Sequence, residues 1–127
     1  MSTIEGTRAI DAPEKLAMLR GAVVTTVTAW RHGVTLGFND SPLAINIEGG
    51  ATLESPGRTE SFGEDDRISL AKRLLDLLGA HAAAAAVFND ETFAIAFESD
   101  LKLIIRPDGS GAESYAIFLP DGSTLVG

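Results

Sequence analysis

Apolar and polar residues alternate along several short stretches of the chain, with the period of two that is typical of β-strands. Two of these stretches match each other when Pro42 is treated as an extra residue: VTLGFNDSPLAINI at 34–47 and FAIAFESDLKLII at 93–105. In each, two alternating segments flank a polar turn, which indicates a hairpin. The β-branched run AVVTTVTAW before the first stretch favours a further strand. We therefore predict a three-stranded β-meander that recurs in the second half, as a possible internal repeat.

Several shorter segments complete the predicted strands. The residues around 51–54 predict a short strand that extends the first meander, and ESYAIFL and the final PDGSTLVG predict a strand, a turn and a last short strand. The segment HAAAAAV at 81–87 is ambiguous, because five alanines favour a helix on propensity alone. Its alignment with TTVTAW, and the glycine that precedes it, favour a strand instead.

Two segments have helical spacing. A short helix at 12–20 is predicted from the N-cap Asp11, the early Pro13 and the terminating Gly21. A longer helix is predicted to carry the acidic triplet Glu64, Asp65 and Asp66 in its first turn and to end at Gly79. Its predicted buried stripe consists of Ile68, Ala71, Leu74, Leu75 and Leu78.

These elements predict an α+β fold, in which two antiparallel β-meanders pack with one long central helix and a short N-terminal helix. Residues 1–10 show no periodicity and are expected to be a flexible N-terminus, whereas 11–127 are expected to form a single domain. Strand order stays open at this point, because the meanders could form one curved sheet or two sheets that face each other.

The net charge of −8 makes a basic nucleic-acid-binding face improbable, because the ten lysines and arginines form no stripe. Acidic residues gather between 48 and 66, where six of them accompany the single base Arg58: Glu48, Glu54, Glu60, Glu64, Asp65 and Asp66. Such a segment steers a basic partner or simply keeps a small protein soluble. No stretch of about 18 apolar residues and no secretory signal is present, so we expect a cytoplasmic protein that neither spans nor binds a membrane.

The residues that carry chemistry are sparse. The chain has no cysteine and only two histidines, His32 and His81, so no zinc site of ordinary spacing can be drawn. No nucleophile motif and no phosphate-binding glycine loop occurs. We therefore predict no cofactor, no metal and no enzymatic activity.

The candidate binding residues are aromatic and acidic. Trp30 and Tyr115 are the only residues of their kinds and are favoured interface anchors, although each can equally pack on a sheet with its polar group satisfied. The acidic triplet at 64–66 can likewise serve the helix N-terminus rather than a partner. The residues proposed for partner binding are Trp30, Glu60, Glu64, Asp65 and Asp66.

The tail ESYAIFLPDGSTLVG, after the hairpin that contains LKLIIRPD, resembles the end of a group of small bacterial domain families of unknown function. Members of these families run β-meander, helix, β-meander, and end with a Glu-x-Trp/Tyr strand before a Pro-Asp-Gly turn. The segment GAVVTTVTAWRHGVTLGFND resembles their opening hairpin, so the resemblance spans roughly 21–127. Some of these families are similar to immunity proteins of bacterial toxin systems.

The resemblance and the acidic segment together favour a non-enzymatic binding protein of the immunity or inhibitor type, which occludes a basic protein partner such as a toxin. One alternative is a small-molecule-binding domain with a pocket between sheet and helix, lined by Gly37, Ala94 and Ala96. Another is a structural module that forms a homodimer through an exposed sheet edge.

Overall fold

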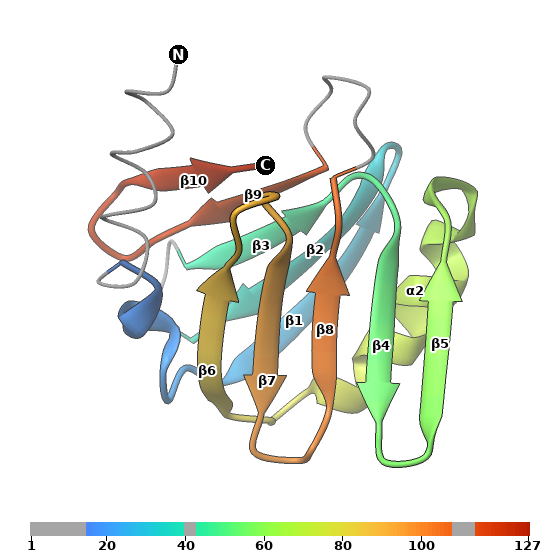
Figure 1. The fold of residues 1–127 in the computed structure, drawn as a ribbon, viewed down its shortest axis with the longest axis horizontal. Coiled ribbons are helices and arrows are strands. Elements are labelled where there is room, and N and C mark those ends of the chain that lie inside the picture. The colour runs from blue at the N-terminus through green and yellow to red at the C-terminus, as the bar shows by residue number, and fades with distance from the viewer. Residues whose placement is uncertain (1–14, 40–42, 108–113) are drawn as a thin grey trace.

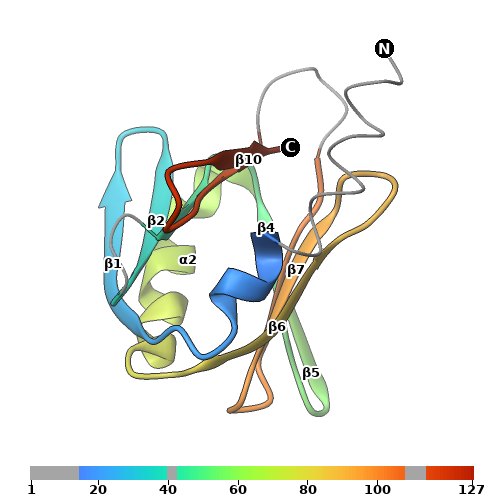
Figure 2. The same cartoon turned by 90° about the vertical axis from the view of Figure 1, so that its left-hand side faces the viewer.

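The computed structural model describes residues 15–39, 43–107 and 114–127, and these form two five-stranded antiparallel sheets that face each other (Figures 1 and 2). Sheet I has the order β1 (Val24–Trp30), β2 (Gly33–Phe38), β3 (Ala44–Ile47), β9 (Tyr115–Phe118) and β10 (Thr124–Val126). Sheet II has the order β5 (Arg58–Phe62), β4 (Ala51–Ser55), β8 (Lys102–Ile105), β7 (Phe93–Phe97) and β6 (Ala82–Val87). The protein is therefore α+β as predicted, with β-structure predominant.

The core lies between the two sheets, and strand alternation fills it. On β2 the buried side chains are Val34, Leu36 and Phe38, and on β7 they are Phe93, Ile95 and Phe97. The residues between them therefore point outward, because successive side chains of a strand lie on opposite faces. The stretches that matched in the sequence thus occupy corresponding places in opposite sheets.

Each sheet combines a meander from one half of the chain with a hairpin from the other. The hairpin β4–β5 adds to β8, where Leu53 pairs with Leu103, and the hairpin β9–β10 adds to β3, where Ile117 pairs with Ile45. The prediction that the strand near 51–54 extends the first meander is therefore wrong. It crosses to the opposite sheet, and its partner β5 was not predicted because a polar edge strand has no apolar alternation.

The sheets are joined at one corner by a hydrogen-bond pattern that recurs 58 positions along the chain. Gly21 donates its N–H to the carbonyl of Ala82 (2.7 Å), and Gly79 donates to the carbonyl of Val24 (2.8 Å). Both glycines have a positive φ, 83° and 84°, which an L side chain adopts only with strain. Each half of the chain therefore enters its first strand in the same way.

Residues Ala82–Val87 are a strand, so the meander pattern prevails over the helix propensity of five alanines. This strand pairs with β7, and its register shifts between Ala82 and Ala84. Tertiary pairing commonly overrides a propensity of a few tenths of a kcal/mol per residue.

The long helix consists of η2 (Glu64–Asp66), α2 (Arg67–Leu74) and η3 (Leu75–Leu77), without a break. It lies in the space between the sheets, against β1 and β2 on one side and β5 on the other (Figure 2). Its fully buried residues are Leu70, Leu74 and Leu77, so the predicted buried stripe is largely wrong. Three of its members are about half exposed: Ile68 (51%), Leu75 (49%) and Leu78 (47%).

Only part of the predicted N-terminal helix can be compared with the structure. From Lys15 onward a 3-10 turn, η1 (Ala17–Leu19), buries Leu19 completely, whereas a helix over 12–20 is not confirmed. The predicted flexible segment 1–10 lies outside the described residues. Within those residues, no helix has the length and apolar character needed to cross a membrane.

Candidate partner-binding surface

Trp30 and the start of the long helix lie at the same end of the molecule. Trp30 is the last residue of β1, and its backbone carbonyl accepts a hydrogen bond from Nε of Arg67 at 2.9 Å. Arg67 is the first residue of α2 and directly follows the acidic triplet. The structure therefore brings Trp30 close to the acidic triplet at 64–66.

The three acidic residues at 64–66 differ in their contacts. Asp66 accepts a hydrogen bond from the N–H of Gly63 at 2.9 Å, while its own N–H donates to the carbonyl of Gly63 at 3.0 Å. Asp66 therefore closes the first turn of the helix, where an anion is also favoured by the helix dipole. Glu64 and Asp65 are exposed and have no side-chain partner among the described residues. Those two carboxylates remain available to another molecule.

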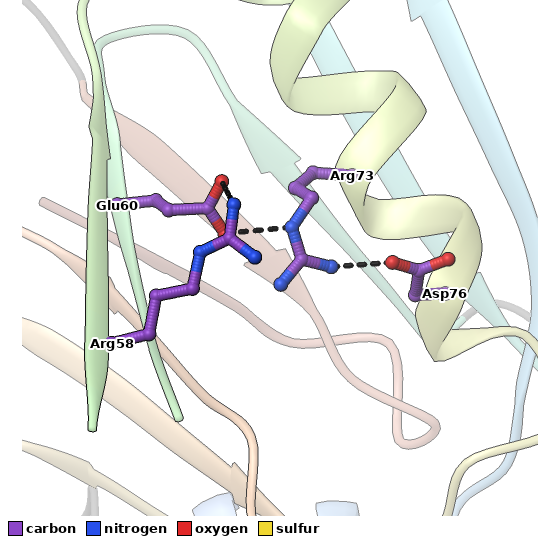
Figure 3. A network of polar contacts seen from close by, with 4 residues as sticks. All are labelled: Arg58, Glu60, Arg73 and Asp76. Atoms are coloured by element: carbon purple, nitrogen blue, oxygen red, sulfur yellow. Dashed lines mark hydrogen bonds and ion pairs between the residues drawn. The ribbon is translucent and has the colours of Figure 1, made fainter. Parts of the chain in front are cut away.

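Glu60 does not belong to this exposed acidic surface. It stands opposite the buried Leu53 in the register of β4 and β5, so its side chain points toward the inner side of the sheet. There Nε of Arg73 donates to Oε1 of Glu60 at 2.7 Å, and Arg58 donates to Oε2 at 3.1 Å (Figure 3). Arg73 also pairs with Asp76. The hydrogen bond that Arg73 donates to Glu60 is the main cause that raises the pKa of Arg73. Glu60 therefore attaches the helix to strand β5.

Trp30 is not an open aromatic anchor. The indole is partly buried and contacts the ring of His32 edge to face, with ring centroids 5.8 Å apart. Its Nε1 is buried and has no hydrogen-bond partner among the described residues, which is an uncommon condition for an indole N–H. Tyr115 is fully buried, donates its hydroxyl to the carbonyl of Glu91 at 2.7 Å and packs against Phe93. Tyr115 is therefore a core residue.

The exposed apolar side of the long helix was missed in the sequence because its residues were assigned to the core. Ile68 of α2, Leu75 of η3 and Leu78, which directly follows η3, are here called the helix ridge. They are spaced by seven and three positions, and the exposed Lys72 lies between the first two. Residues at such spacing share a face of a helix, and Glu64 and Asp65 stand one turn before Ile68 on that face. Ile68 is therefore one helical turn from two unpaired carboxylates, and the helix ridge with Glu64 and Asp65 makes up the candidate surface.

The residues predicted to line a pocket between sheet and helix do not do so. Gly37 lies between the buried Leu36 and Phe38 on β2, and Ala94 and Ala96 flank the buried Ile95 on β7. All three therefore face outward, and they belong to opposite sheets. The space between sheet and helix is instead filled by the leucines of the core.

Comparison with known proteins adds no functional information, because no protein-family model, no curated protein and no solved structure matches the chain. The resemblance to small bacterial domains thus stays a prediction. The surface that carries the argument consists of Glu64, Asp65 and the helix ridge.

Proposed function

We propose that the protein is a non-enzymatic binding protein that occludes a basic surface of another protein, as an immunity protein or inhibitor would. The observation that carries this proposal is the surface formed by the helix ridge and the carboxylates of Glu64 and Asp65. Large side chains that are half exposed are favourable to bury, at about 25 cal/mol per Å² of apolar surface. Two unpaired carboxylates beside them favour lysines or arginines on the partner.

The two parts of the surface have separate roles in this mechanism. Long-range attraction from an acidic protein of net charge −8 raises the association rate with a basic partner. Burial of Ile68 and Leu75 then slows dissociation, because their apolar surface must return to water before the partner can leave. Glu60, held by two arginines, contributes by fixing the position of the helix rather than by contacting the partner.

The first experiment is affinity capture of the tagged protein from its source lysate, with washes of rising salt and identification by mass spectrometry. A single stoichiometric basic partner that salt releases is the expected result. Its affinity is then measured for the double variants Glu64→Gln/Asp65→Asn and Ile68→Ser/Leu75→Ser. We expect losses of about tenfold for the first and about a hundredfold for the second.

The matched control is Glu98→Gln/Asp100→Asn, which removes the same two charges from the turn between β7 and β8. If the control lowers affinity as much as Glu64→Gln/Asp65→Asn, net charge alone drives binding and the surface is misplaced. If the ridge variant binds as well as the wild type, the proposal is wrong. A dimer detected by sedimentation, and abolished by Ile68→Ser/Leu75→Ser, would assign the same surface to self-association instead.

We also infer that the two halves are an internal repeat. The support is the hydrogen-bond pattern shared by Gly21 and Gly79 and the exchange of equivalent hairpins between the sheets. A permuted chain that begins at Gly63 and ends at Phe62 would then keep the order of helix, meander and hairpin. We expect it to fold cooperatively, as seen in a urea transition, and a chain without such a transition would count against interchangeable halves.

A further inference from the structure

The outer face of sheet II carries a depression of about 320 Å³ that the proposed function does not use. Its floor contains Ala94 of β7 and Ile104 of β8, and the half-exposed ring of Phe88 stands at its side. A smaller depression of about 160 Å³ adjoins it, and the two share Ile104 and Arg106. A volume of this size is at the lower limit of what small-molecule sites enclose.

Two cations line the larger depression. Lys102 of β8 and Arg106, which directly follows β8, line the depression together with Ile104. The two cations are four residues apart, which corresponds to about 13 Å of extended chain. Neither side chain has an ion pair or hydrogen bond with any described residue. A guanidinium and an ammonium that form no hydrogen bond within the described part of the chain thus stand beside an apolar floor.

Two carboxylates limit the positive potential there. Asp90 lines the depression, and hydrogen bonds from Thr92, together with the charge of Arg106, lower the pKa of Asp90. Glu54 stands opposite Lys102 in the register of β4 and β8, outside the depression. Oδ1 of Asp90 accepts a hydrogen bond from the N–H of Thr92 at 3.0 Å, and the negative charge of Asp90 partly offsets the charge of Arg106.

The fold itself does not require these cations, as the corresponding face of sheet I shows. Lys102 pairs with Ala96 of β7, and at the corresponding place Ala44 pairs with Gly37 of β2. Two and four residues after Ala44 the chain has Asn46 and Glu48, whereas two and four residues after Lys102 it has Ile104 and Arg106. The same backbone pairing is thus built on sheet I with an amide and a carboxylate at the positions that carry Ile104 and Arg106 on sheet II.

We propose that this depression binds a small carboxylate with an apolar body. The carboxylate lies against Arg106, whose planar guanidinium donates two parallel hydrogen bonds to such a group, and Lys102 adds a second positive charge. The apolar body covers Ile104 and Ala94 and contacts the ring of Phe88. Asp90 opposes binding by its charge.

The test is a titration of the isotope-labelled full-length protein with 3-phenylpropionate, followed by amide chemical shifts. We expect saturable shifts at residues of β7 and β8 around Ala94 and Ile104, with a dissociation constant in the millimolar range. Arg106→Gln should weaken binding about tenfold, which is typical of the loss of a hydrogen-bonded charge. Lys102→Gln should weaken it about threefold, and Asp90→Asn should strengthen it about twofold.

Two controls make the result decisive. Lys72→Gln removes an exposed cation on the helix and should leave the titration unchanged, and 3-phenylpropanamide, which lacks the charge, should bind at least about tenfold more weakly. Because Arg106 is exposed and without a partner among the described residues, its variant should keep the wild-type melting temperature. The proposal is overturned if 3-phenylpropionate gives no saturable shifts up to about 10 mM. It is also overturned if the Arg106→Gln variant binds 3-phenylpropionate as tightly as the wild type does, or if the wild type binds the amide as tightly as the acid.

Discussion

The ion pair between Glu60 and Arg73 offers a direct test of how the long helix is held. Its two side chains come from β5 and α2, lie 2.7 Å apart at the paired atoms, and are each only 22–23% exposed. An exposed pair contributes roughly 0.2–1 kcal/mol, and a hydrogen bond to a charged group in a protected place roughly 1.5–3 kcal/mol. This pair is mostly but not fully shielded, so we expect Glu60→Gln to lower the free energy of unfolding by about 1 kcal/mol.

The assay is urea denaturation followed by the fluorescence of Trp30, the only tryptophan in the chain. With an m-value of about 2 kcal/mol/M, a loss of 1 kcal/mol moves the midpoint down by about 0.5 M. Asp76→Asn is the matched control, because Asp76 pairs with the same arginine but is 64% exposed. We expect its effect to stay below about 0.5 kcal/mol.

The reasoning would be refuted if Glu60→Gln changed the midpoint no more than Asp76→Asn does. A double-mutant cycle with Arg73→Gln should give a coupling free energy of about 1 kcal/mol for the Glu60 pair. The coupling should persist in part at 1 M NaCl, because the screening that abolishes exposed pairs is weaker for shielded ones.

Three further results are expected. Leu74→Ala should lower the free energy of unfolding by about 3 kcal/mol, because Leu74 is fully buried. Leu75→Ala, at the neighbouring half-exposed position, should lower it by less than about 1 kcal/mol, and the urea midpoints of the two variants measure this difference. Gly33→Ala should destabilise by about 2 kcal/mol or more in the same assay, because its Cβ would lie 2.1 Å from a backbone carbonyl oxygen of β3. Hydrogen bonds from Ser123 lower the pKa of Asp121 below its ordinary 3.8, so the wild type should exceed Asp121→Asn in melting temperature above about pH 5, and the difference should vanish as the pH falls through that lowered pKa.

The local alternation of apolar and polar residues was sufficient to predict most strands, whereas it could not predict which strands from distant parts of the chain pair with each other. The matched stretches became β2–β3 and β7–β8, because each carries its own turn and its own buried face. The exchange of hairpins was not predicted, since nothing local in Ala51–Ser55 distinguishes β3 from β8 as a neighbour. The strand Arg58–Phe62 was missed for a related reason, because its inward position carries Glu60 rather than an apolar residue.

The helix shows a second limit of periodicity. Leu70, Leu74 and Leu77 have helical spacing, but so do Ile68, Leu75 and Leu78, and a sequence with two apolar faces does not say which one is buried. The same ambiguity concealed the helix ridge. The sequence also did not show which acidic residues have partners within the protein. The contacts of Glu60 with Arg73 and of Asp66 with Gly63 are visible only in the structure, and they distinguish these two acids from Glu64 and Asp65.

Lys102 and Arg106 could have been recognised from the sequence. The run KLIIR places both cations and Ile104 on one face of a strand. From the sequence, the ten lysines and arginines were considered only as a possible basic stripe, which they do not form. Alternation within a single strand was the available signal. What the sequence lacked was the register that sets Ala94 and Thr92 beside them.

The exchange of hairpins also determines the order in which the protein can be completed during synthesis. Sheet I lacks β9 and β10 until residues 115–126 have been synthesised. Until then one edge of β3 is unpaired, and the apolar side chains of Ile45 and Ile47 lie on this incomplete strand. Unpaired strand edges of this kind are the usual starting points of misassembly between nascent chains. A nascent chain that ends before Ser114 therefore keeps this edge of β3 unpaired and remains a target for chaperones.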